Sequence, residues 1–168
     1  PDIVYHGVQY VLKSIDRGGT WEQLSPDLTY NDPEKQGDIS YQTITALEES
    51  QFNSKLLYAG TDDGRLWRTR DGGLSWEDIR KEPLPVRWIS RIVASKYDFG
   101  TVYVTQTGRR DDDAAVYVWR SKDFGTTWAD ISANVPAGPV NVIREDPEKE
   151  NILYLGTDGW SFVSKGKG

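Results

Sequence analysis

Short apolar runs of four to seven residues recur along the whole chain and are separated by clusters of Gly, Asp, Asn and Pro. Runs of this length, rich in Val, Ile, Leu, Trp and Tyr, are typical of β-strands. Only residues 33–37 and 147–151 have the composition of a helical turn. The pattern therefore predicts an all-β chain made of many short antiparallel strands.

The runs form a unit of four strands that repeats along the chain. The predicted first strands are 44–48, 89–94 and 140–145, and the second are 3–7, 56–61, 101–105 and 152–157. The third strands are 10–14, 65–69, 116–121 and 161–164, and the fourth are 21–24, 76–79 and 128–131. The predicted units are a partial one at residues 1–30, complete ones at 41–80 and 88–132, and a partial one at 140–168. The first unit lacks its first strand and the last lacks its fourth.

Residue columns support this alignment of the repeats. The third strands carry a large apolar residue at one position and a mostly basic residue at the next, as expected for opposite faces of a strand. The apolar column is Leu12, Trp67, Trp119 and Phe162, and the neighbouring column is Lys13, Arg68, Arg120 and Val163.

Two of the intervals between strands are constant and two vary. The head of each first strand lies 14 residues before the tyrosine of the second strand, as from Ile44 to Tyr58. The third and fourth strands are joined by a motif of constant length. Successive turns of an up-and-down sheet alternate between its two ends, so the constant turns share one face and the variable connections share the other. Binding residues on a fixed scaffold usually lie on varied loops, so the variable face is the candidate binding face.

The constant motif between third and fourth strands has the form Ser/Thr-x-Asp-x-Gly-x-Ser/Thr-Trp. The Asp can accept hydrogen bonds from N–H groups further along the turn, and the Gly can adopt a positive φ. We interpret the three carboxylates as turn caps rather than as a metal or acid–base set, and the tryptophans as packing between units rather than as a sugar platform. The motif residues are Ser14, Asp16, Gly18 and Trp21; Thr69, Asp71, Gly73 and Trp76; and Ser121, Asp123, Gly125 and Trp128. A degenerate fourth copy starts at Ser164, with Gly166 in place of the Asp.

This motif resembles the Asp-box, or bacterial neuraminidase repeat (BNR), of sialidases, sortilin-like receptors and bacterial proteins of the glycosyl hydrolase type. The resemblance covers nearly the whole chain. It implies four-stranded β-propeller blades in which the Asp-box is a structural hairpin away from the catalytic centre. It also implies an extracellular or periplasmic location. With two complete blades and two partial ones, the chain is expected to be part of a larger propeller or to be completed by a second copy.

The amino-acid composition argues against several classes of function. The net charge is −6 and no basic stretch offsets it, which argues against nucleic-acid partners. No apolar run is long enough to span a bilayer. His6 is the only histidine and there is no cysteine, so Ser-His-Asp catalysis and multi-histidine metal sites are not expected. Every glycine cluster lies in a turn of the repeat, and no cofactor or metal is predicted.

The predicted ligand-binding residues lie on the variable face. Asp111–Asp113 lacks the spacing of an EF-hand loop, so we interpret it as a solvated charged loop. Asp62–Gly64 and Asp158–Gly159 have the composition of turns, and we interpret them as turns before assigning them any binding role. The candidates are Asp62, Asp63, Arg65, Arg87, Trp88, Arg109, Arg110, Asp112, Asp158 and Trp160.

Two functional hypotheses follow. In the first, the chain is a non-catalytic binding or scaffold segment that recognises a peptide or glycan on the variable face. In the second, it is part of a BNR-repeat glycoside hydrolase, sialidase-like or glucanase-like. Hydrolysis needs a pair of suitably spaced carboxylates, and no pattern selects one pair. The arginines near this face do not recur at one repeat position, so the arginine triad of sialidases is not matched. The prediction is that the isolated chain hydrolyses no glycoside.

Overall fold

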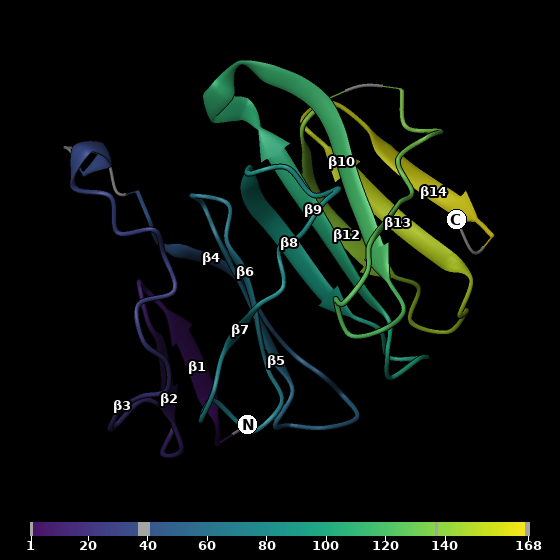
Figure 1. Ribbon diagram of the computed structural model, residues 1–168. Coiled ribbons are helices and arrows are strands. Elements are labelled where there is room, and N and C mark those ends of the chain that lie inside the picture. Colours follow the sequence, from purple (N-terminus) through teal and green to yellow (C-terminus); the bar gives the residue numbers. More distant parts are fainter. Residues whose placement is uncertain (1, 37–40, 137, 167–168) are drawn as a thin grey trace.

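The computed structural model describes residues 2–36, 41–136 and 138–166 and folds into four antiparallel sheets that follow one another along an open arc (Figure 1). The first sheet contains β1 (Val4–Gly7), β2 (Val11–Ser14) and β3 (Glu22–Gln23). The second contains β4 (Ile44–Glu49), β5 (Leu57–Thr61), β6 (Leu66–Thr69) and β7 (Glu77–Asp78). The third contains β8 (Trp88–Ala94), β9 (Val102–Gly108), β10 (Asp113–Ser121) and β11 (Ala129–Asp130). The fourth contains β12 (Val140–Glu145), β13 (Ile152–Thr157) and β14 (Ser161–Lys165).

The prediction of an all-β, partial β-propeller is confirmed. Strands within each sheet are neighbours in chain order, as in an up-and-down blade. The first sheet has three strands because it begins at the second strand of the unit, and the last has three because it ends at the third. The degenerate fourth motif lies partly outside the described residues, since these end at Gly166. Among the described helices, none is long and apolar enough to cross a membrane.

The first of the two predicted helical turns is present, and the second is not. The first becomes a 3-10 helix, η1 (Pro33–Lys35), capped by the carboxylate of Asp32, and Gly37 lies outside the described residues. Residues 147–151 form bends and a turn, not a helix. There the Asp146 carboxylate accepts hydrogen bonds from the N–H groups of Glu148 and Lys149, which is a local alternative to helical bonding. A second 3-10 helix, η2 (Arg109–Asp111), forms in a loop for which no helix was predicted.

The hydrophobic core is divided into three layers, each between two neighbouring sheets. The central layer contains Leu66 and Ile79 from the second sheet and Val104, Trp119 and Trp128 from the third or its flanks. A second layer joins the third and fourth sheets, and a third joins the first and second. Neighbouring sheets therefore stabilise one another, as in stacked repeats.

The Asp-box turns have nearly identical hydrogen bonds in all three copies. In the third copy the Ser121 hydroxyl donates to Asp123 and accepts from the Gly125 N–H, both at 2.7 Å. The other Asp123 bonds come from the N–H and hydroxyl of Thr127, at 2.8 and 2.7 Å. Gly18, Gly73 and Gly125 have φ of +95°, +100° and +91°. In each copy the Asp carboxylate accepts hydrogen bonds from within its own turn.

The box glycine and tryptophan also join each blade to the preceding one. The indole N–H of Trp76 donates to the Leu24 carbonyl and that of Trp128 to the Ile79 carbonyl, both at 3.2 Å. A Cβ at Gly125 would lie 2.5 Å from Ile79 Cδ1, and one at Gly73 would lie 2.3 Å from Leu24 Cγ. Glycine is thus required here both for its positive φ and for close approach of the preceding blade.

The basic column of the third strands does not simply face solvent. Arg68 is buried and donates to the Phe124 carbonyl in the Asp-box of the next blade, at 2.8 Å, and pairs with Glu77. Both faces of an inner blade are covered, so a basic residue at this column can connect blades instead of marking an exposed face.

The first strands are joined around the inner edge of the arc through a repeated bulge. The pairing of first and second strands shifts register at Thr45, Ser90 and Asn141. The Thr45 hydroxyl donates to the Ile89 carbonyl at 2.8 Å, and the Ser90 hydroxyl donates to the Val140 carbonyl at 2.6 Å. A β-bulge re-aims a side chain, and here it directs a hydroxyl to the next blade.

The lowered pKa values of the Asp-box carboxylates predict that the protein loses stability in acid. Hydrogen bonds from Thr20 and Ser14 lower the pKa of Asp16 to about 2. Burial raises the pKa of Asp123, but bonds from Thr127 and Ser121 outweigh it and lower the pKa to about 2. Bonds from Ser75 and Thr69 lower the pKa of Asp71 as well. Because a folded-state pKa below the unfolded value stabilises the ionised native form, this contribution is present above about pH 4 and is lost towards pH 2.

Urea midpoints measured from pH 6 to pH 2 test this prediction. The triple variant Asp16→Asn, Asp71→Asn, Asp123→Asn should be less stable at pH 6 and should lose less stability on acidification. Asp113 and Asp146 also have lowered pKa values, so part of the pH dependence should remain. If the urea midpoint of the triple variant fell with pH as steeply as that of the unaltered protein, the three Asp-box carboxylates would not be the source of the acid sensitivity.

Candidate functional site

The variable connections of neighbouring blades meet at one end of the sheets. The turn between β9 and β10 reaches back to the second blade, where Arg110 Nη1 lies 2.9 Å from Asp62 Oδ2. It also reaches forward to the fourth blade, where Arg109 Nη1 lies 3.7 Å from Asp158 Oδ2. These contacts bring together side chains from three blades.

Arg110 is enclosed by two aromatic rings and a carboxylate. Its guanidinium carbon lies 4.3 Å from the Trp88 ring centre and 5.0 Å from that of Tyr41. Its partner Asp62 is buried, with a side chain 2% exposed, and also accepts the Thr43 N–H at 2.8 Å. Cation–π stacking and a charge-assisted hydrogen bond act on the same guanidinium, so this cluster fixes the loop over the second blade.

A second arginine fixes the other side of the same loop. Arg87 Nε lies 3.0 Å from Asp113 Oδ2 and 3.6 Å from Asp111 Oδ2. The Tyr117 hydroxyl donates to Asp113 at 2.7 Å. The bonds from Tyr117, the Ala115 N–H and Arg87 hold the pKa of Asp113 below its usual range. Asp113 is therefore a structural anion rather than a proton donor near neutral pH.

An open cavity of about 320 Å³ lies beside these clusters, where the first strands approach one another. Its lining combines one aromatic ring with hydroxyl, amide and guanidinium groups. The lining residues are Thr45, Trp88, Ser90, Thr107, Arg109 and Asn141. None of these six carries a carboxylate. Asp158 does not line the cavity but contacts two residues that do. It accepts a hydrogen bond from Asn141 Nδ2 at 2.7 Å and pairs with Arg109.

The remaining predicted residues do not line this cavity. Arg65 lies over the rings of Tyr30 and Trp67 and pairs with Asp78, all outside the cavity lining. Asp63 is buried and accepts bonds from the Thr61 hydroxyl and the Tyr30 N–H, so it organises a turn. Asp112 ends η2 with φ +52°. Trp160 is exposed in the turn between β13 and β14, where its backbone bonds to Thr157.

Five lining or stacking residues were not among the predicted site residues: Tyr41, Thr45, Ser90, Thr107 and Asn141. Tyr41 stands in the long connection before β4, where no repeat column identifies it. Thr45, Ser90 and Asn141 could have been selected together, because they occupy the same position in their first strands. The signal was a column of polar residues one place after the head of each first strand.

The first-strand carboxylates lie towards the Asp-box end, away from the cavity. Burial raises the pKa of Glu48, with opposing effects from the Ala94 backbone, Arg144 and Arg91. Glu145 accepts bonds from the Ser95 hydroxyl at 2.6 Å and the Lys96 N–H at 2.9 Å, in the turn between β8 and β9. A raised carboxyl pKa is what a general acid needs, but Glu48 is not placed to act on a ligand in the cavity.

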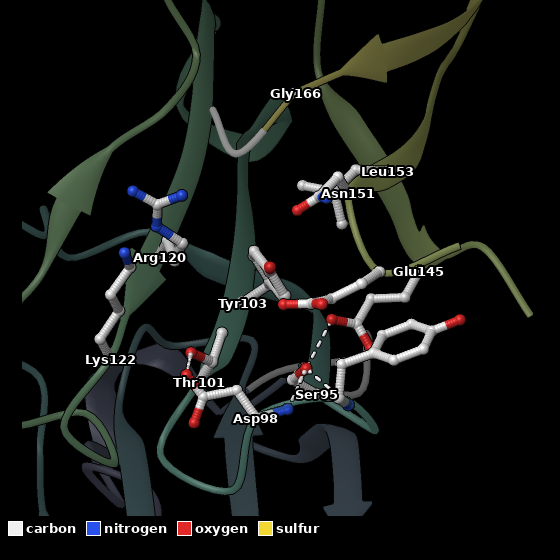
Figure 2. A pocket seen from close by; sticks show the side chains of 12 residues that line it. Ser95, Asp98, Thr101, Tyr103, Arg120, Lys122, Glu145, Asn151, Leu153 and Gly166 are labelled. Atoms are coloured by element: carbon white, nitrogen blue, oxygen red, sulfur yellow. Dashed lines mark hydrogen bonds between the residues drawn. The ribbon is translucent and has the colours of Figure 1, made fainter. Parts of the chain in front are cut away.

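Figure 2 shows a second, smaller cavity between the third and fourth blades on the Asp-box side. Ser95, Asp98 and Thr101 lie together on its floor in a hydrogen-bonded group that includes Glu145, while Arg120 and Lys122 line another side. Its volume is about 60 Å³, room for a few water molecules rather than for a sugar or a peptide. The larger cavity on the variable face is therefore the candidate functional site.

Comparison with known proteins agrees with the motif and the fold. The BNR-Asp box repeat model matches residues 118–131, which contain the third Asp-box. Sortilin of Rattus norvegicus is 27% identical over 100 residues, covering 60% of this chain and 12% of sortilin. Xyloglucanase Xgh74A of Acetivibrio thermocellus is 28% identical over 163 residues, covering 91% of this chain and 16% of the enzyme. The chain thus carries BNR-type Asp-box repeats and is similar to both receptors and glucanases.

The structural comparison supports the same fold. The GH74 xyloglucanase from Xanthomonas campestris superposes with a TM-score of 0.74 at 18% identity, covering 99% of this chain and 27% of that one. At this identity the likeness concerns the fold alone. The chain spans less than a fifth of the length of the curated relatives named above.

Proposed function

We propose that the chain is a non-catalytic, saccharide-binding segment of a larger extracellular or periplasmic β-propeller, with the ligand in the cavity on the variable face. The observation that carries the proposal is the lining of that cavity. Trp88 offers an aromatic ring, while Ser90, Thr107, Asn141 and Arg109 offer groups that hydrogen-bond to hydroxyls. One apolar surface and a few convergent polar groups are typical of small-molecule sites, and 320 Å³ suits one or two sugar rings.

A glycoside hydrolase is the second candidate, because one relative is a xyloglucanase. Glycoside hydrolysis commonly uses two carboxylates on either side of the scissile bond. The cavity lining contains none, and Asp158, Asp62 and Asp113 each hold an arginine in place. Binding without turnover is the function that this geometry favours.

Calorimetric titration with xyloglucan oligosaccharides, cello-oligosaccharides and sialyllactose tests the binding proposal. We expect saturable binding of a neutral oligosaccharide and a loss of about tenfold or more for Trp88→Ala, since central aromatic side chains dominate binding energy. Trp160→Ala is the matched control, because Trp160 is an exposed tryptophan in a variable-face turn of the fourth blade that does not line the cavity. Equal losses from both variants, or no binding by the unaltered protein, would overturn the proposal.

A turnover assay separates the two candidates. Reducing-sugar release from xyloglucan and cleavage of aryl glycosides and sialosides should stay at the background rate at high protein concentration. Turnover abolished by Asp62→Asn, Asp63→Asn or Asp112→Asn would establish the hydrolase instead. Asp158→Asn should be assayed in parallel, because Asp158 is the carboxylate that contacts two cavity residues.

A further inference from the structure

The cavity on the variable face is lined by one polar residue from the first strand of each of three neighbouring blades. Thr45, Ser90 and Asn141 occupy the same position of β4, β8 and β12, at the shift of register. Thr45 and Asn141 are exposed, and Ser90 is half-buried. A hydroxyl or an amide can both donate and accept hydrogen bonds. Which of these it offers to a ligand depends on the partners that it already has inside the protein.

The two hydroxyls give their only proton to the backbone of the next blade. Thr45 Oγ1 donates to the Ile89 carbonyl at 2.8 Å, and Ser90 Oγ donates to the Val140 carbonyl at 2.6 Å. Ser90 Oγ also lies 2.8 Å from Thr105 Oγ1, and because the Ser90 proton points to a carbonyl, Thr105 is the donor of this bond. A hydroxyl has one proton and two lone pairs, so each oxygen keeps a lone pair and no proton. Towards the cavity, both hydroxyls are therefore acceptors.

Asp158 orients the third polar group. Asn141 Nδ2 lies 2.7 Å from Asp158 Oδ1, and an ionised carboxylate only accepts, so the nitrogen of the amide must face Asp158. The amide oxygen Oδ1 is then turned away from Asp158, and a carbonyl oxygen only accepts. The other carboxylate oxygen of Asp158 lies 3.7 Å from Arg109 Nη1, which holds the carboxylate in place. Asp158 is thus a positioning residue that fixes the direction of the Asn141 amide.

We propose that Thr45, Ser90 and Asn141 form an acceptor column that selects saccharides by the free O–H groups that they point at it. Arg109 lines the same cavity and has only donors, so it takes the acceptor groups of the ligand. This inference rests on the proposed function and names the groups that decide the specificity of that site. A ligand group that only accepts, such as an ether oxygen or a fluorine, would place lone pairs against lone pairs at the column, and polar groups left unpaired in this way reject a ligand.

The charges around the cavity favour a neutral donor over a cationic one. Arg109 lines the cavity, and Arg110 stacks on the Trp88 ring that also lines it. Their partner carboxylates, Asp158 and Asp62, do not line it. An ammonium group would therefore meet guanidinium groups at closer range than carboxylates, whereas a hydroxyl donates without carrying a charge. The ligand that fits best is a neutral saccharide with unsubstituted hydroxyls rather than an amino sugar.

Calorimetric titration of the intact chain with methyl β-cellobioside and its single deoxyfluoro analogues tests the proposal. Fluorine is close to a hydroxyl in size but cannot donate. At least one analogue should bind about tenfold or more weakly than the parent sugar. That loss should shrink to about twofold in Thr45→Val or Asn141→Ala, which lack one acceptor, as in a double-mutant cycle. Thr126→Val is the matched control, because the Thr126 hydroxyl also donates to a carbonyl, that of Asp123, at 2.8 Å, but on the Asp-box face.

Asp158→Ala separates the direction of the amide from packing. Without the carboxylate the Asn141 amide can turn and donate, so the analogue whose loss depends on Asn141 should regain affinity relative to the parent sugar. Asn141 is exposed, so Asn141→Ala decides the test if Thr45→Val does not fold. Equal discrimination against fluorine in the unaltered protein and in these variants would overturn the acceptor column while leaving saccharide binding intact. Failure of methyl β-cellobioside to bind would also overturn it, whereas the proposed function depends on the wider panel of oligosaccharides.

Discussion

Trp128→Ala should lower the free energy of unfolding by about 3–5 kcal/mol, the range for removing a buried tryptophan. Trp128 is 8% exposed and lies in the core layer between the second and third blades. The variant leaves a cavity in that layer and leaves the Ile79 carbonyl without its indole donor. Urea unfolding followed by circular dichroism should show a lower midpoint with an unchanged slope.

Trp21→Ala is the matched control, because Trp21 occupies the same position of the first Asp-box. Its side chain is 45% exposed, and its ring makes an edge contact with His6 at 6.0 Å between centres. The expected loss is about 1 kcal/mol or less. Comparable losses for the two variants would show that the tryptophans act within their own hairpins, contrary to the packing between blades described above.

The contrast between Trp21 and Trp128 shows how far the sequence predicts this fold. The Asp-box is a local motif, and its constant length fixes the hydrogen bonds around Asp16, Asp71 and Asp123 in the same way. Strand order and the position of the turns followed from spacing alone. The burial of side chains did not follow from spacing. The tryptophan at one and the same motif position is exposed or buried according to whether a blade packs against it from the preceding repeat.

The candidate site was less predictable for a similar reason. Sequence reasoning identified the variable face and named Arg110, Trp88 and Asp62, which the structure brings together. It could not place Tyr41 next to Arg110, because that contact joins segments far apart in the chain. Arg65 was selected for its charge, yet its partners Asp78, Tyr30 and Trp67 lie outside the cavity. Charge and position predict a face, but pairing between distant segments decides which residues line the cavity.

Asp62→Ala should lower the free energy of unfolding by about 2–3 kcal/mol and should loosen the loop that carries Arg110. Asp62 is the buried partner of an ion pair, and removing one partner of such a pair leaves an uncompensated charge. The Arg110 side chain is 37% exposed and can be partly hydrated, so the loss is smaller than for a fully buried pair. The Thr43 N–H also loses its acceptor, which adds the cost of an unsatisfied donor.

Two further variants separate the charge of Asp62 from its hydrogen bond. Asp62→Asn keeps an acceptor for the Thr43 N–H and removes the charge, so its urea midpoint should lie between those of the unaltered protein and Asp62→Ala. Arg110→Gln removes the guanidinium from Trp88 and Tyr41 but leaves a carboxylate that still accepts the Thr43 N–H. Because Arg110 stacks on Trp88, both Asp62 variants should also change the Trp88 fluorescence, measured as the difference from the same variants carrying Trp88→Phe. A stable Asp62→Ala protein with unaltered fluorescence would show that Asp62 does not organise this loop.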